Sequence, residues 1–97
     1  MAKQAPECCE LCGRNVGLQF HHLIPRKNHG KTWFKRNFDK QEMRLRGAWL
    51  CSLCHRFIHR QFDEQTLGRQ LNTVTALQAE ESVQIHIAWA AKQRRAF

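Results

Sequence analysis

Two pairs of cysteines with Cys-x-x-Cys spacing are the strongest constraint on how this chain can fold. The first pair is Cys9 and Cys12, the second is Cys51 and Cys54, and residues 13–50 separate them. Two correctly spaced pairs together supply the four thiolates of a tetrahedral structural zinc site. The spacing therefore predicts a zinc ion that ties the N-terminal turn to the centre of the chain.

The fifth cysteine and the N-terminus bear on the redox compartment. Cys8 precedes the first pair, and its use in place of Cys9 would give the less common Cys-x-x-x-Cys spacing. An odd number of cysteines without an apolar signal segment favours thiolate ligands over disulfides. No apolar run approaches the roughly 18 residues needed to span a membrane. We therefore expect a cytoplasmic protein in which Cys9 is the ligand.

Positive charge is concentrated in the first two thirds of this small, 97-residue chain. The net charge is +8, and residues 14–60 hold eleven Lys or Arg against two acidic residues, whereas residues 63–97 are balanced. This distribution indicates a polyanionic partner for the first part. Residues 26–46 interleave basic residues with Trp33 and Phe34, which suits a loop or short helix lying against phosphates. Alternatively, the aromatic residues cover the core.

Hydrophobic patterning predicts two strands followed mainly by helices. Residues 17–24 alternate as a strand that Pro25 ends, and residues 47–50 form a second strand leading into the second cysteine pair. Asp63 and Thr73 are suitable helix N-caps. The expected helices cover residues 51–62, 63–71, a segment that begins at 74, and 81–95.

Histidines in the same region have the spacing of a second metal site. His55 and His59 are four apart, so on a helix they share one face and can chelate one ion. His21 and His22 are neighbours on an extended chain and point to opposite sides, so a division of labour between them is favoured. Three histidines that leave positions open for water and phosphate are typical of a catalytic metal. His86 falls on the apolar side of the last helix and is expected to be a core residue.

At these positions the sequence resembles the HNH endonucleases, in the branch with a four-cysteine structural zinc and among small standalone bacterial proteins. The matching segments are residues 21–25 (HHLIP) and 50–59 (LCSLCHRFIH). The resemblance implies an α+β fold in a single domain, residues 1–97. A zinc-stapled, treble-clef-like ββα-metal core would occupy residues 8–62. Residues 63–97 would form a helical extension that packs on the core or, as a homodimer or with a protein partner, on another chain.

The resemblance also implies a reaction and roles for the histidines. His21, His55 and His59 would hold a catalytic divalent metal (Mg²⁺, Mn²⁺, Ni²⁺ or Zn²⁺), and His22 would be the general base. The implied activity is hydrolysis of phosphodiester bonds in double-stranded DNA, by nicking or cleavage. The expected phosphate contacts are Arg26, Lys27, Arg56 and Arg60.

One position departs from the family pattern, and two other functions fit parts of the sequence. Many HNH members have an asparagine five residues before the third cysteine, where this chain has Arg46, and Asn28 or Asn37 is a candidate substitute. The main alternative is a non-catalytic, zinc-dependent DNA-binding module. Haem attachment at Cys51–His55 fits the Cys-x-x-Cys-His pattern, but it requires secretion and leaves the first cysteine pair without a role.

Overall fold

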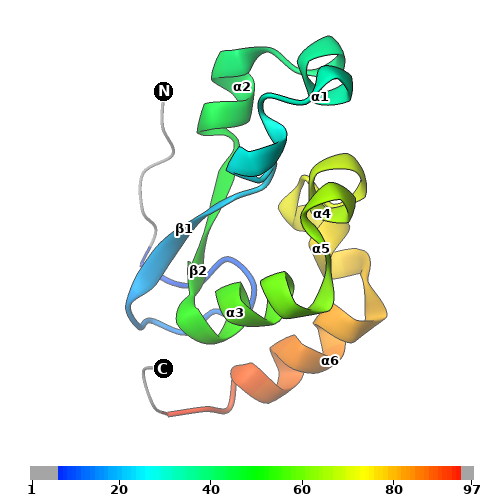
Figure 1. Cartoon of the computed structure of the whole chain (residues 1–97). Coiled ribbons are helices and arrows are strands. Elements are labelled where there is room, and N and C mark those ends of the chain that lie inside the picture. Colours follow the sequence, from blue (N-terminus) through cyan, green and yellow to red (C-terminus); the bar gives the residue numbers. More distant parts are fainter. Residues whose placement is uncertain (1–6, 95–97) are drawn as a thin grey trace.

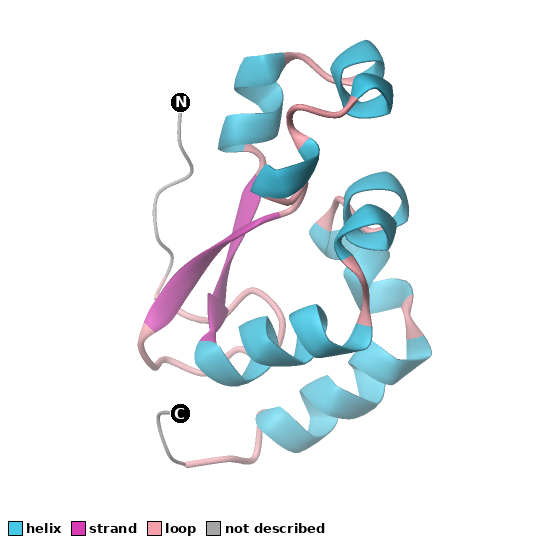
Figure 2. Ribbon diagram, viewed as in Figure 1, coloured by secondary structure: helices cyan, strands magenta, loops and turns pink. Residues whose placement is uncertain are grey.

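Residues 7–94 form a two-stranded antiparallel sheet surrounded by helices, described by a computed structural model (Figure 1). Within this range the chain has two strands, six α-helices and one 3-10 helix, so the predicted α+β class is confirmed. Figure 2 shows the two strands enclosed on several sides by helices. The elements are β1 (Leu18–His22), η1 (Arg26–Asn28), α1 (Thr32–Asn37), α2 (Lys40–Leu45), β2 (Gly47–Cys51), α3 (Ser52–Gln61), α4 (Glu64–Gln70), α5 (Val74–Ala79) and α6 (Glu81–Ala90).

Strand β1 pairs with β2, and its two neighbouring histidines lie opposite different residues of β2. His21 lies opposite Ala48 and His22 opposite Gly47. A Cβ atom at Gly47 would lie 2.0 Å from the ring of Phe20, so only glycine fits beneath this ring. The predicted strand 17–24 is too long, because β1 spans only five residues and ends before Pro25 turns the chain.

The basic segment between the strands is helical rather than a loop, and its aromatic residues divide between core and surface. Phe34 of α1 is buried in a small cluster with Ile24 and Met43. Trp33, its neighbour, is 37% exposed and lies beneath the Arg69 guanidinium, 4.3 Å from its ring centre. Phe34 therefore packs in the core, which agrees with the alternative that the aromatic residues of this segment cover the core.

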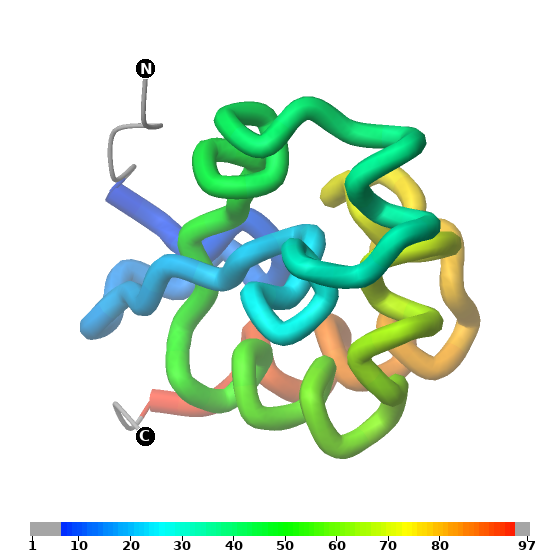
Figure 3. Tube along the Cα trace, turned by 45° about the horizontal axis from the view of Figure 1, so that its top comes forward, coloured from blue at the N-terminus to red at the C-terminus, as the bar shows by residue number. Residues whose placement is uncertain are grey.

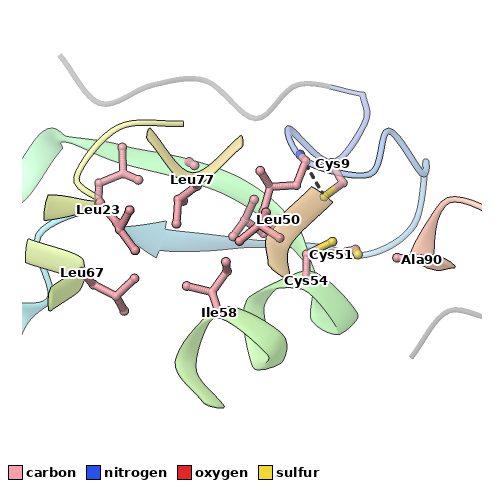
Figure 4. Packing of buried hydrophobic residues seen from close by; sticks show 13 residues of the cluster. Cys9, Leu23, Leu50, Cys51, Cys54, Ile58, Leu67, Leu77 and Ala90 are labelled. Carbon is pink, nitrogen blue, oxygen red and sulfur yellow. Dashed lines mark hydrogen bonds between the residues drawn. The ribbon is translucent and has the colours of Figure 1, made fainter. Parts of the chain in front are cut away.

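The main core joins the sheet to helices α3, α4 and α5. Leu50, Ile58, Leu67 and Leu77 come from four elements and converge in this cluster (Figure 4). The three cysteines that Figure 4 labels lie at one end of the same cluster. The structure thus places the cysteine site against the hydrophobic core rather than at the surface.

The C-terminal helices return the chain to α3. Asp63 and Thr73 accept hydrogen bonds from the backbone amides of Thr66 (2.7 Å) and Ala76 (3.0 Å), which confirms both predicted N-caps. Helix α6 then packs along α3 and α5; it lies below α3 in Figure 1 and behind it in Figure 3. Within residues 7–94 no helix is long and apolar enough to cross a membrane.

The last helix is shorter than predicted and leaves part of its apolar surface exposed. Helix α6 ends at Ala90, because the next turn tightens, with the Gln93 amide bonded to the Ala90 carbonyl; position 95 lies outside the described residues. Val83 and Ala90 are buried, whereas Ile85 is 66% and Trp89 50% exposed. The apolar side chains of α6 are therefore only partly covered, since α6 packs against other elements on one side.

Candidate metal centres

The four cysteines of the two Cys-x-x-Cys pairs meet at one point. Their sulfur atoms all lie within 4.8 Å of one another, and Sγ of Cys12 is 3.6 Å from Sγ of Cys51. Tetrahedral zinc with bonds of about 2.3 Å separates its sulfur ligands by roughly 3.8 Å. Cys8 is exposed and lies outside the cluster, in agreement with the choice of Cys9. The four sulfurs could therefore hold a structural metal such as zinc.

Local structure shapes both halves of the cysteine cluster. The first pair sits on a tight turn in which the amides of Leu11 and Cys12 donate to Sγ of Cys9 at 3.4 and 3.5 Å. Gly13 closes this turn with φ = 81°, a conformation that favours glycine. Cys51 is the N-cap of α3, so the positive end of the helix dipole faces the sulfurs. Both features stabilise thiolates.

The pKa values of the thiols also fit a cation bound between the four sulfur atoms. A hydrogen bond from the Cys54 thiol lowers the pKa of Cys9 to about 4. The same bond raises the pKa of Cys54, and burial raises that of Cys12 to about 11. One thiolate forms readily while its neighbours resist ionisation, because like charges would be buried together. A divalent metal would offset this repulsion.

Three histidines form a second cluster, where β1 contacts α3. His21, His55 and His59 have ring nitrogens within 4.8 Å of one another. Nε2 of His55 lies 3.2 Å from Nε2 of His59, which suits two nitrogens that share one ion at about 2.0–2.1 Å. His21 comes from β1 and the other two from α3, so tertiary packing brings the cluster together.

Burial favours the neutral form of His21 and His55, two of the three histidines in this cluster. His21 is fully buried, and burial, followed by His55 and His59, lowers its pKa to about 3. Burial also lowers the pKa of His55. Gln19 Oε1 accepts a hydrogen bond of 2.8 Å from Nδ1 of His55, which leaves Nε2 as the nitrogen with a free lone pair. Neutral rings with free lone pairs are the form that metals bind.

His22 lies beside the histidine cluster but outside it. It borders a small cleft together with His55 and His59, and with Arg26 it also borders a larger, basic cavity of about 920 Å³. Burial, then His29 and Arg26, lowers the pKa of His22. The two neighbouring histidines therefore lie at different places, with His21 in the cluster and His22 at the edge of the cleft beside it.

The four expected phosphate contacts lie on two sides of the histidine cluster. Arg26 and Lys27 are exposed and border the cleft of His22. Arg56 and Arg60 are exposed on α3 and border a different groove, next to α6. His59 borders both, so the basic residues flank the cluster rather than forming one patch.

Arg46 and the two candidate asparagines have structural partners of their own. Arg46 donates to Oδ1 of Asn72 at 3.2 Å and forms a salt bridge with Glu42. Asn28 is buried and donates to the Glu64 carbonyl at 2.7 Å. Asn37 bonds to the carbonyl of Trp33 within its own helix. The amide donors of both asparagines are thus engaged with backbone carbonyls, of Glu64 and Trp33 respectively.

Two residues that contact the histidines of this region were not identified from the sequence. Gln19 accepts a hydrogen bond from His55. Because Gln19 is two residues before His21 on a strand, the alternation of side chains could have predicted that Gln19 and His21 lie on the same side. His29 donates from Nε2 to the Ile24 carbonyl at 2.7 Å, and its ring centre is 6.2 Å from that of His22. No spacing rule indicates His29, because the turn after Pro25 positions it.

Fold and clusters together define a class of protein. The chain is a small α+β protein with a site suited to a structural metal, compatible with a zinc-binding ββα-like module. No protein-family model and no solved structure matches it. Uncharacterized protein YisB of Bacillus subtilis (strain 168) is 37% identical over 94 residues, which cover 96% of this chain and 82% of YisB. The chain therefore belongs to the YisB family.

Proposed function

We propose that the protein is a metal-dependent endonuclease of the HNH type that hydrolyses phosphodiester bonds of double-stranded DNA. The observation that carries the proposal is the lack of hydrogen bonds to the buried ring of His21. Both of its ring nitrogens are buried and have no hydrogen-bond partner among the described residues. Unpaired buried polar atoms destabilise a fold, and a metal ion shared with His55 and His59 would satisfy one of these nitrogens.

The metal would supply Lewis-acid chemistry. A divalent ion (Mg²⁺, Mn²⁺, Ni²⁺ or Zn²⁺) held by His21, His55 and His59 would polarise a phosphate and stabilise the leaving 3′-oxygen. Gln19 supports this role by orienting His55 through a hydrogen bond to the nitrogen that faces away from the cluster. The cysteine site, with structural zinc, would hold β2 and α3 in place beneath the histidines.

His22 is the general base in this proposal. Its pKa is lowered by burial, so its ring is neutral at pH 7 and can take a proton from water that attacks the phosphorus. It borders the same cleft as His55 and His59, which supports a shared role for the three histidines in the proposed reaction. Arg26 and Lys27 border this cleft and would hold the neighbouring phosphates, which orients the DNA without reading its sequence.

Nicking of supercoiled plasmid with single added divalent metals tests the proposal. His22→Ala should reduce cleavage by something like 10²–10⁴-fold, the usual contribution of a general base. Zinc content and affinity for duplex DNA should stay close to those of the wild type. Equal nicking by the two proteins, purified identically, would remove His22 from the mechanism.

A DNA-binding module without catalysis is the second candidate. It is favoured by Arg46, which stands where many HNH members have asparagine and is bonded to Asn72 and Glu42. Salt-sensitive binding of duplex DNA, without nicking under any divalent metal, would support this function and overturn the nuclease.

A further inference from the structure

A groove between α3 and α6 adjoins the proposed catalytic cleft. Its lining residues are Leu53, Arg56, His59, Arg60, His86 and Trp89. His59 borders both the groove and the cleft that contains His22, so a strand leaving the cleft can continue into the groove. The described lining has two arginines and no carboxylate, and neither arginine forms a salt bridge with another described residue. The groove is thus suited to an anionic chain.

Aromatic rings form one side of this groove. The His86 ring stacks on Phe57, with ring centres 4.1 Å apart and planes at 10°. Trp89 follows at 5.8 Å from His86 but is tilted by 45°, so the two rings do not cover each other face to face. Half of the Trp89 side chain is exposed. The row of rings therefore ends in an accessible indole beside two arginines, of which Arg56 donates from Nε to the Ser52 carbonyl at 3.4 Å and neither forms a salt bridge among the described residues.

We propose that this groove binds unpaired nucleotides adjoining the cleaved phosphate, with one base stacked on Trp89 and the backbone held by Arg56 and Arg60. The inference rests on the proposed nuclease function and narrows its substrate to DNA with a single-stranded stretch beside the cleaved bond. Exposed indoles and arginines are what single-strand binding sites combine, because the faces of unpaired bases are free to stack. Bases in a duplex already stack on their neighbours.

A second copy of this chain is the competing occupant, since Ile85 and Trp89 are both exposed on α6. A symmetric dimer through this face would bring two copies of Arg56 and Arg60 toward each other, in a chain whose net charge is already +8. Like charges at an interface weaken it, whereas the same arginines favour a nucleic-acid backbone. The charge of the groove therefore favours the nucleotide strand.

Fluorescence anisotropy in the His22→Ala background, which measures binding without cleavage, tests the inference. A labelled short oligothymidylate should bind Trp89→Ala roughly 5- to 150-fold more weakly, the range for loss of one stacked base. Trp89→Phe should keep most of the affinity, and binding of a duplex of equal length should change little. Trp33→Ala is the matched control, because Trp33 is also partly exposed but Arg69 covers its ring; its affinity should stay unchanged.

Abasic strands separate stacking from a structural effect. Removal of bases from the oligothymidylate should weaken binding to the wild-type groove, whereas Trp89→Ala should no longer respond to their loss. Equal weakening of duplex and single strand, or no effect of Trp89→Ala, would overturn the inference. So would a wild-type dimer in sedimentation that Trp89→Ala dissociates while DNA binding is unchanged. Because cleavage is not measured, failure of the nuclease proposal in the plasmid assay is distinguished from failure of this one.

Discussion

Nε2 of His59 lies 3.2 Å from Nε2 of His55, one helical turn away on α3 and facing the buried ring of His21. On a helix, the i, i+4 spacing of these two histidines therefore brings their ring nitrogens to a separation that one metal ion can span. The exposed member of the cluster is His59, so its removal disturbs the fold least. It is therefore the best position at which to test metal binding.

His59→Ala should lower affinity for the divalent metal, and excess metal should partly restore nicking. His21 and His55 remain in place, so the site loses one ligand of three. Titration of the zinc-loaded protein with Mn²⁺ or Ni²⁺ measures the change, and Gln19→Leu should give a smaller loss, roughly 10-fold, because it removes only the support of His55. Unchanged metal affinity in His59→Ala would argue against the three-histidine site.

Replacement of one cysteine of the four-sulfur cluster should unfold the protein at much lower temperature. Cys51→Ser removes a buried ligand that joins β2 to α3, and the melting temperature should fall by about 10 °C or more. Cys8→Ser is the matched control, because Cys8 is exposed and outside the cluster. Bound zinc per chain and the melting curve are the measurements. Identical curves for the wild type and Cys51→Ser would mean that the cysteines hold no structural metal.

Arg46 should contribute to stability through its side chain. Arg46→Asn, which introduces the residue usual in the HNH family, breaks the bonds to Asn72 and Glu42 and should cost about 1 kcal/mol in the free energy of unfolding, because the ion pair is partly exposed to solvent. Arg44→Asn, at an exposed position on the same helix, should cost little. Urea unfolding of both variants measures the difference. Equal stabilities would show that the Arg46 contacts are weak.

Affinity for duplex DNA should fall steeply with salt. Each phosphate contact contributes about −0.9 to the slope of log K against log salt concentration, so Arg26→Ala should reduce that slope by about one. Lys92→Ala is the control, since Lys92 borders neither the cleft nor the groove. A slope that Arg26→Ala leaves unaltered would remove Arg26 from the DNA interface.

Stability should depend on pH through His86. Burial, followed by Arg60, lowers the pKa of His86 below 6.5 in the folded state. The unfolded chain therefore binds more protons, and stability is lost as pH falls from about 6.5 through the folded pKa, by at most about 1.4 kcal/mol per unit. His86→Phe keeps the stack on Phe57 and should reduce this slope. The difference in slope between the two proteins, measured by urea unfolding, isolates His86; equal slopes would contradict its role.

The sequence by itself determined the local elements and the ligand types. Asp63 and Thr73 cap their helices as predicted, because a cap depends only on residues within one turn. The Cys-x-x-Cys pairs and the i, i+4 histidines likewise define donor atoms by short spacing. Strand and helix ends were less certain: β1 stops at His22 and α6 at Ala90, since tertiary packing and turn geometry decide where an element ends.

Only the tertiary structure decided which distant residues meet. The pairing of β1 with β2 and the packing of α3 bring His21 to His55, and no spacing along the chain specifies that approach. The tertiary structure also decided that Phe34 is buried in the core while Trp33 remains at the surface. The groove at Trp89 arises in the same way, because α6 covers α3 along one side only. Long-range contacts form wherever apolar surfaces can be buried together, and this depends on the whole chain at once.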